Sequence, residues 1–204
     1  DAAFLEEISK MKEKNIAIEL LKKLLAERVT IYQKTNLVQA EKFSDLLNRA
    51  LSNYLKGLLT NEEVIQELLK LAAEISESEN QGNELGLTAE EKSFYDALTK
   101  PRAVQDIYTN EQLVAMTKEL TDALRKNRTI DWQKKESARA GMRRMIKRLL
   151  KKYKYPPEEA ENALETVIHQ CEQWTDNDSD NYNSSLNETK KYDFHNETYP
   201  PMAA

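Results

Sequence analysis

The segment RKNRTIDWQKKESARAGMRRMIKRLLKKYKYPP (residues 125–157) carries the clearest structural pattern of the chain. At 100° per residue, its apolar side chains after Lys134 fall within an arc of about 140° on one helix surface. The arc contains Ala138, Met142, Met145, Ile146, Leu149, Leu150 and Tyr153. Tyr155 is followed by two prolines, which interrupt a helix because proline lacks the backbone N–H. The segment therefore predicts an amphipathic helix over about residues 132–153 that packs on other elements through this arc.

The opposite half of this expected helix is strongly basic. Residues 125–154 hold thirteen lysines and arginines against two acids, although the whole chain has a net charge of −5. Like charges four residues apart form two ladders on this face, and each such pair costs roughly 0.2–0.5 kcal/mol in an isolated helix. A face of this kind requires neutralising partners. We predict that six of its cations contact phosphate groups or an acidic protein surface: Arg143, Arg144, Lys147, Arg148, Lys151 and Lys152.

The basic face could also be neutralised inside the chain. Four acids open the next expected helix and could fold back to pair with the cations. These acids are Glu158, Glu159, Glu161 and Glu165. The helix could instead lie on a membrane surface, but its apolar arc lacks Trp and Phe, which favours packing inside the protein. The basic face therefore indicates either an external anionic partner or internal ion pairs.

The composition of the whole chain favours an all-α fold. Its 204 residues contain four glycines and five prolines, too few for most folds that are rich in turns or sheets. Leu, Glu, Lys and Ala dominate, and these residues favour helices. Apolar residues recur at helical spacing in several further segments. Helices are predicted over about residues 2–12, 16–29, 37–56, 61–75, 89–98, 110–126, 132–153 and 158–174.

Local signals mark several of these helix boundaries. Three threonines precede expected helices and are followed three residues later by Glu or Gln, the spacing of a capping box. The pairs are Thr60/Glu63, Thr88/Glu91 and Thr109/Gln112. Gly57 is predicted to end the third helix, because glycine readily adopts the left-handed conformation that commonly follows a helix.

Polar segments divide the chain into expected domains. Residues 1–80 are predicted to form a helical bundle segment, residues 81–87 a linker, and residues 88–174 a small C-terminal helical domain. Residues 175–204 hold six acids against two lysines and few aliphatic side chains, which predicts a disordered tail. The sequence begins without Met or a signal-peptide pattern, and we expect it to be a fragment of a longer protein.

Familiar catalytic and cofactor motifs do not occur in the sequence. It contains no GxxxxGK[ST] loop, no GxGxxG, no HExxH and no GxSxG. The single Cys171 suits the cytosol, and one cysteine with two histidines argues against a zinc site. No apolar run of 18 residues is present, so no membrane span is predicted. We therefore expect neither enzymatic activity nor a cofactor for this chain by itself.

Three segments together resemble a known family. They are NLVQAEKFSDLLNRALSNY (residues 36–54), LGLTAEEKSFYDAL (residues 85–98) and residues 125–157, in which TIDW, ESARA and YPP follow in order. From about residue 4 to residue 174 the chain resembles the C-terminal region of the restriction (R, motor) subunit of type I restriction–modification enzymes. The third segment is the most specific of the three.

The resemblance implies a helical region that follows the nuclease core and the two RecA-like motor domains of such a subunit. The parent subunit would cut DNA after ATP-driven translocation and use ATP and Mg²⁺, but none of its catalytic motifs lies in this chain. The resemblance further implies docking onto the methyltransferase core (the M and S subunits), contact with double-stranded DNA, and the bacterial cytoplasm.

Three residues near the start of the basic helix are expected to be structural. Trp132 should anchor the helix start in the core, with stacking on a nucleic-acid base as the alternative. Arg139, in the family-like ESARA stretch, is expected to form a buried ion pair with Glu136 or another acid.

The sequence thus predicts a non-catalytic module that docks the motor subunit onto the methyltransferase and contacts DNA through the basic helix. One alternative is a purely structural helical spacer whose basic face is neutralised internally. Another is a stand-alone nucleic-acid-binding regulator, which only the basic face favours.

Overall fold

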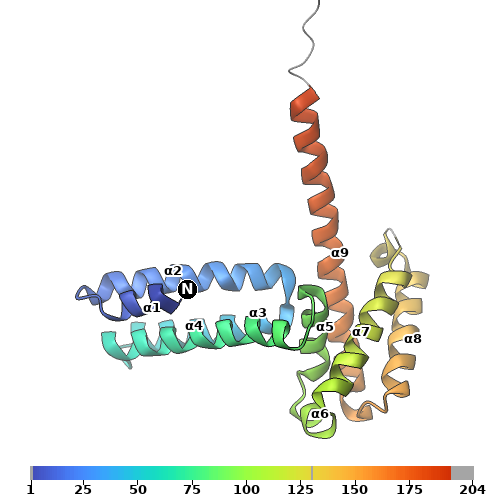
Figure 1. Ribbon diagram of the computed structural model, residues 1–204, viewed down its shortest axis with the longest axis horizontal. Coiled ribbons are helices and arrows are strands. Elements are labelled where there is room, and N and C mark those ends of the chain that lie inside the picture. Colours follow the sequence, from blue (N-terminus) through green and yellow to red (C-terminus); the bar gives the residue numbers. More distant parts are fainter. Residues whose placement is uncertain (1, 130, 194–204) are drawn as a thin grey trace, which may run out of the picture.

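The computed structural model describes residues 2–129 and 131–193, which form helices and loops without any strand. The elements are α1 (Ala2–Ser9), α2 (Lys14–Thr35), α3 (Leu37–Leu55), α4 (Asn61–Glu84), α5 (Ala89–Thr99), α6 (Arg102–Ile107), α7 (Asn110–Asn127), the 3-10 helix η1 (Trp132–Lys134), α8 (Glu136–Lys152) and α9 (Pro157–Asp193). Helices α1–α4 form an elongated arm, α5–α8 form a bundle beside one end of it, and α9 passes through this bundle and projects beyond it (Figure 1). The predicted all-α fold is confirmed for these residues.

All three predicted capping boxes are present. At the start of α4 the backbone N–H of Glu63 donates to Thr60 Oγ1 at 3.3 Å, and the backbone N–H of Thr60 donates to Glu63 Oε2 at 2.7 Å. The same reciprocal arrangement opens α5 and α7. Each box satisfies backbone N–H groups at the start of the helix that would otherwise lack a partner. These three helices therefore begin where the local sequence predicts.

Glycines with positive φ follow α3 and α4. Gly57 has a φ of 72° and Gly86 a φ of 64°, values that a side chain would strain. Beyond Gly57, the backbone N–H of Leu58 donates to the carbonyl of Asn53 at 2.9 Å, which closes a Schellman motif. The predicted end of the third helix at Gly57 is confirmed.

The first hydrophobic core lies in the arm, where α2, α3 and α4 pack together and α1 lies against α2 and α4. Leu21, Phe43, Val64 and Leu68 are fully buried there. The ring of Phe43 also contacts the ring of Tyr32, with 5.4 Å between centroids. Each of the three long helices presents one apolar stripe at helical spacing, and the three stripes close on one another.

The second hydrophobic core is enclosed by α5, α7, α8 and α9. Helix α5 lies at its centre and contacts α2, α3, α6, α7 and α9. Every residue of α5 from Lys92 to Thr99 is buried, charged residues included. Because α5 is covered on all sides, its polar side chains must find partners inside the protein.

One side chain of α9 ties the turn between α2 and α3 to the second core. The backbone N–H of Leu37 donates to Gln170 Oε1 at 2.8 Å, and Gln170 Nε2 donates to the carbonyl of Thr35 at 3.1 Å. Gln170 is fully buried, and its amide satisfies two backbone groups that the change of direction between the helices leaves unpaired.

A buried cluster centred on Asp96 of α5 reinforces this junction. The carboxylate of Asp96 accepts from Lys92 Nζ at 2.5 Å, from Asn36 Nδ2 at 2.7 Å and from Gln39 Nε2 at 3.0 Å. Asn36 also caps α3, since its side chain accepts from the backbone N–H of Gln39 at 3.2 Å. The arm and the C-terminal bundle are therefore joined by charge-assisted hydrogen bonds as well as by apolar contact.

Three helices run further than the sequence predicts. Helix α2 continues to Thr35, past the expected end at about residue 29. Helix α4 continues to Glu84, through a polar stretch expected to be a loop and into the predicted linker 81–87. Helix α9 continues to Asp193, past the expected end at Trp174 and into the segment predicted to be disordered. The division into two domains at residues 81–87 stays a prediction.

Tertiary contacts support α9 beyond Trp174. Trp132 Nε1 donates to Thr175 Oγ1 at 3.1 Å, and Gln133 Nε2 donates to Asp176 Oδ1 at 3.0 Å. The sequence also has no glycine or proline between residues 158 and 199 to stop the helix. A polar composition alone therefore did not indicate where this helix ends. The remainder of the predicted tail, residues 194–204, lies outside the described residues.

Candidate functional site

Helix α8 packs into the second core through the predicted apolar arc. Met142, Ile146, Leu149 and Leu150 are buried, and Ala138, Met145 and Tyr153 pack against the same core while partly exposed. The arc faces α7 and α9, which leaves the basic half of the helix on the outside. The six cations predicted as contact residues thus lie on or near the protein surface, and their partners differ.

Two of these six cations pair with acids of α9. Arg143 makes a bidentate ion pair with Glu165, in which Arg143 Nη2 lies 2.9 Å from Glu165 Oε2. Lys147 Nζ lies 3.0 Å from Glu161 Oε2. Glu161 and Glu165 belong to the four acids that the sequence offered for internal neutralisation. Internal ion pairs therefore account for this edge of the basic face.

A third cation pairs with α7, in a way the sequence did not indicate. Lys152 Nζ donates to both carboxylate oxygens of Glu119, at 2.6 and 2.8 Å, and the hydroxyl of Tyr153 donates to Glu119 Oε2 at 2.7 Å. The hydrogen bonds from Lys152 and Tyr153 lower the pKa of Glu119. The hydrogen bond to Glu119 and burial raise the pKa of Tyr153 to about 12. Glu119 lies more than thirty residues before Lys152, so no local spacing could reveal the pair.

Of the three residues expected to be structural, Trp132 lies in η1, and Glu136 and Arg139 lie in the first turn of α8, which begins at Glu136 and not at the predicted residue 132. Trp132 is fully buried in the second core, which leaves no ring face for stacking on a base. Arg139 forms an ion pair with Glu172 of α9 and is about one-third exposed, whereas Glu136 is exposed at the first position of α8. These contacts fasten α8 to α9.

Arg144, Arg148 and Lys151 differ from the other cations of the six. All three are exposed, and no described acid lies within ion-pair distance of them. Their spacing of four and three residues puts them on one face of α8, along about 10 Å at 1.5 Å per residue. We call these three residues the open basic stripe. It is the part of the basic face that remains available to an external anion.

The pair between Arg143 and Glu165 makes a pH-dependent contribution to stability. The hydrogen bond from Arg143 lowers the pKa of the Glu165 carboxyl below its usual range. The contribution is therefore complete above the ordinary pKa of a glutamate and is lost as pH falls through the lowered folded-state pKa. Because both side chains are about one-third exposed or more, we expect only about 0.2–1 kcal/mol.

We expect Glu165→Gln to lower the free energy of unfolding by about 0.2–1 kcal/mol at pH 7. The difference in unfolding free energy between the variant and the wild type should shrink toward zero below about pH 4. Urea unfolding of both proteins between pH 7 and pH 3 measures it. Glu158→Gln provides the matched control, because Glu158 is exposed and has no ion pair among the described residues. A difference that grows on acidification would contradict the assignment.

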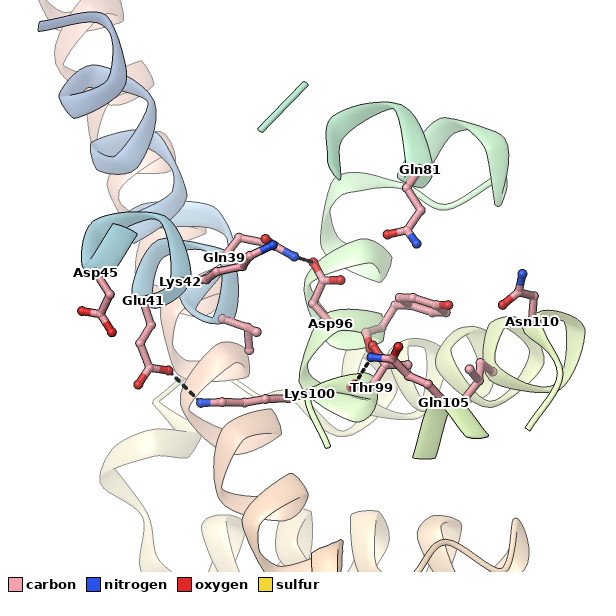
Figure 2. A pocket seen from close by; sticks show the side chains of 13 residues that line it. Gln39, Glu41, Lys42, Asp45, Gln81, Asp96, Thr99, Lys100, Gln105 and Asn110 are labelled. Carbon is pink, nitrogen blue, oxygen red and sulfur yellow. Dashed lines mark hydrogen bonds and ion pairs between the residues drawn. The ribbon is translucent and has the colours of Figure 1, made fainter. Parts of the chain in front are cut away.

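A second charged surface lies between α3, the end of α4 and α5. Two adjoining hollows of about 640 and 890 Å³ share Gln39, Lys42 and Gln81 in their linings. Their acidic lining residues are Glu41, Asp45, Glu74, Glu77, Glu84 and Asp96, and their lysines are Lys42 and Lys100. Figure 2 shows the first hollow, with Glu41 and Lys42 on one side, Gln81 on another and Asp96 between them. We call the two hollows together the acidic groove.

Some charges of the acidic groove are paired and others are not. Lys100 pairs with Glu41 at 2.7 Å and Lys42 with Glu74 at 3.3 Å, while Asp96 belongs to the buried cluster at the junction. Three carboxylates are exposed and have no ion pair with any described residue: Asp45, Glu77 and Glu84. The groove therefore offers carboxylate oxygens that form no ion pair with the residues that the structure describes.

Neither a metal cluster nor a membrane span is found in the described part of the chain. No three His, Cys, Asp or Glu side chains come together there in a way that could hold a metal ion. None of its helices is both long and apolar enough to span a membrane.

Comparison with known proteins places these surfaces in context. Residues 1–177 match the family model described as type I restriction enzyme HindI endonuclease subunit-like, C-terminal. The type I restriction enzyme HindI endonuclease subunit of Haemophilus influenzae is 38% identical over 170 residues, which is 83% of this chain and 16% of that protein. A putative type I restriction enzyme MjaIXP endonuclease subunit of Methanocaldococcus jannaschii is 31% identical over 150 residues, 73% of this chain and 14% of that protein. No solved structure matches.

Proposed function

The chain belongs to the HindI-like family of type I restriction endonuclease subunits and corresponds to their C-terminal region, and from this premise we propose that it is a non-catalytic docking module. In this proposal it attaches the nuclease and translocase subunit to the methyltransferase core, formed by the M and S subunits, and adds DNA contacts through α8. The chain spans about one-sixth of the length of the relatives it matches. Cleavage, ATP and Mg²⁺ are therefore proposed for the parent subunit and not for this region.

Two features of the molecule support docking. The arm and the bundle are joined by the buried Asp96 cluster and by Gln170, so the module can hold a partner at a fixed position. Opposite charges also lie on different helices, with the open basic stripe on α8 and the acidic groove between α3, α4 and α5. When charges of opposite sign lie on different surfaces of a protein, they orient a binding partner as it approaches more than they increase the binding affinity.

The DNA contact rests on the open basic stripe, which is the single observation that carries this part of the proposal. Arg143, Lys147 and Lys152 already have carboxylate partners, so a phosphate would have to compete for them. Arg144, Arg148 and Lys151 have no such competitor among the described residues. Each cation that contacts a phosphate of duplex DNA adds about 0.9 to the slope of log affinity against log salt.

Replacing the stripe should weaken DNA binding in a salt-dependent way. We expect Arg144→Gln/Arg148→Gln/Lys151→Gln to reduce the magnitude of that slope by about 2.7, because three phosphate contacts are lost. Fluorescence anisotropy with a labelled duplex from low to physiological salt measures the change.

The matched control removes the same charge from the arm, in the variant Lys23→Gln/Lys56→Gln/Lys70→Gln, whose lysines are exposed and have no ion pair with a described residue. The control should bind DNA nearly as the wild type does. Equal slopes in the two variants would assign any binding to net charge and would remove the stripe from the proposal.

The internal pairs favour a second candidate, the structural spacer. Arg143, Lys147 and Lys152 are neutralised within the chain, as that candidate requires. The two candidates differ in what they bind, because a spacer needs neither DNA nor methyltransferase. Sedimentation of the chain with its purified cognate methyltransferase separates them: co-sedimentation supports docking, and independent sedimentation together with no DNA binding supports the spacer.

A further inference from the structure

We propose that Lys154 is a further phosphate contact that extends the open basic stripe past the end of α8, an inference that rests on the proposed DNA binding. Lys154 follows Lys151 by three residues and is exposed. Its backbone has a positive φ, a conformation that disfavours a side chain, and two other helices of this chain have glycine at the equivalent position. Folding alone therefore does not account for a lysine here.

Helices α3, α4 and α8 end in the same hydrogen-bond pattern. At each end a backbone N–H donates to the carbonyl five residues earlier, at 2.9 or 3.0 Å, and the residue just before the donor is left-handed. The left-handed residues are Gly57 (φ 72°), Gly86 (φ 64°) and Lys154 (φ 56°). This pattern is the Schellman motif, in which the left-handed residue is usually glycine. The end of α8 therefore departs from the other two in its residue and not in its geometry.

Conformation, and not space, selects glycine at these positions. A Cβ atom built on Gly57 or Gly86 would meet no other atom within 4 Å. A left-handed backbone nevertheless brings any Cβ close to the following carbonyl oxygen, and lysine is not among the residues that adopt it routinely. The apolar contact that accompanies the motif comes from the next residue, Tyr155, which is buried and donates through its hydroxyl to the carbonyl of Leu98 at 2.6 Å. The Lys154 side chain contributes nothing to this turn.

Intramolecular electrostatics does not explain Lys154 either. The dipole of a helix favours cations in its last turn, but Lys151 and Lys152 already lie there, and a third cation adds repulsion between like charges. Glu158 and Glu159 lie in the first turn of α9, four and five residues after Lys154. Neither forms an ion pair with Lys154 in the described structure. The charge of Lys154 is therefore left to an external anion.

The location of Lys154 suits a phosphate group. Arg144, Arg148 and Lys151 run along one face of α8 toward its C-terminal end, and Lys154 is the next cation without an ion pair to a described residue. Its compact ammonium has three N–H donors on a flexible stem, and lysine binds phosphate as a point charge. A phosphate just past the end of the stripe would meet a side chain that the stripe itself does not supply.

The test combines thermal unfolding of the full chain with fluorescence anisotropy on a labelled duplex at several salt concentrations. Lys154→Gly removes the charge and relieves the backbone together. We expect its Tm to rise by about 2–4 °C. The slope of log affinity against log salt should fall in magnitude by about 0.9, because one phosphate contact is lost. Weaker DNA binding by a more stable variant cannot result from unfolding.

Two further variants isolate the charge. Lys154→Gln leaves a side chain at the same φ, so it should lower the magnitude of the slope by the same amount, about 0.9, without raising Tm. Lys56→Gln is the matched control, because Lys56 is exposed, precedes Gly57 at the equivalent end of α3 and has no ion pair with a described residue. The control should leave the slope unchanged.

The outcomes separate this inference from the function on which it rests. No DNA binding by the wild type at low salt would overturn the DNA contact of α8 and the role of Lys154 together. A slope that falls in the Arg144→Gln/Arg148→Gln/Lys151→Gln variant but not in Lys154→Gln would overturn the role of Lys154 alone. Equal slope losses in Lys154→Gln and Lys56→Gln would do the same, since they would reflect net charge.

Two other results would also contradict the inference. A Tm of Lys154→Gly at or below that of the wild type would mean that the fold itself favours lysine at this position. Loss of binding to the purified cognate methyltransferase, with DNA binding intact, would assign Lys154 to a protein partner.

Discussion

Asp96→Ala is expected to lower the free energy of unfolding by about 3–5 kcal/mol, because it leaves a buried lysine without its counter-charge. The side chains of Lys92 and Asp96 are only 10% and 6% exposed. The same substitution removes the acceptor of the Asn36 and Gln39 amides, which join the arm to α5. Few other single substitutions outside the apolar cores should have an effect of this size.

Urea unfolding at pH 7 measures this loss. The double variant Lys92→Met/Asp96→Leu should recover part of it, since removing both charges avoids the isolated buried cation. Glu41→Gln breaks the pair with Lys100, whose side chains are about half exposed or more, and should cost under about 1 kcal/mol. If Asp96→Ala costs no more than Glu41→Gln, the Asp96 cluster does not stabilise the junction.

Trp132→Ala should destabilise the protein by about 3–5 kcal/mol, because it opens a cavity in the second core. Trp132 is fully buried, and its Nε1 donates to Thr175 Oγ1 at 3.1 Å. The substitution should also loosen α9 near Thr175, since that hydrogen bond holds the helix beyond the core. Thermal or urea unfolding gives the stability, and Trp174 remains as a fluorescent reporter on α9.

Thr175→Val is the control that separates the two roles of Trp132. It removes the acceptor and leaves the indole ring in the core, so it should cost about 0.5–1.5 kcal/mol. Similar losses in the two variants would mean that the hydrogen bond, and not the packing of the ring, is the main contribution of Trp132.

The sequence predicted those parts of the fold whose signals are local. The capping boxes at Thr60, Thr88 and Thr109 and the stop at Gly57 each depend on residues within one helical turn, and all four are found in the structure. The amphipathic character of α8 followed from spacing in the same way. Where a helix depends on distant residues, as α9 does on Trp132 and Gln133, composition gave the wrong end point.

The candidate surfaces were predictable only in part, for the same physical reason. Glu161 and Glu165 could be anticipated as partners of α8 because they open the neighbouring helix. Glu119 could not, since α7 lies far earlier in the chain.

The burial of the charged pair of α5 could not be predicted from the sequence for the same reason. Lys92 and Asp96 have the i,i+4 spacing of an ordinary surface pair, and their burial follows from the other helices packed around α5. The acidic groove, formed by α3, α4 and α5 together, had no signal in the sequence at all.

The hydrogen bonds of Gln170 have a consequence for the synthesis of the protein on the ribosome. This side chain serves two backbone groups of the α2–α3 turn that precede it by 133 and 135 residues. At about 5–20 residues per second, synthesis reaches Gln170 roughly 7–27 seconds after it has passed that turn. Contacts within the arm are closer in sequence, so the arm can form while the turn is still hydrated. Nascent chains arrested before α9 should therefore hold a folded arm with its α2–α3 turn open to water, and the turn is closed only once α9 has been translated.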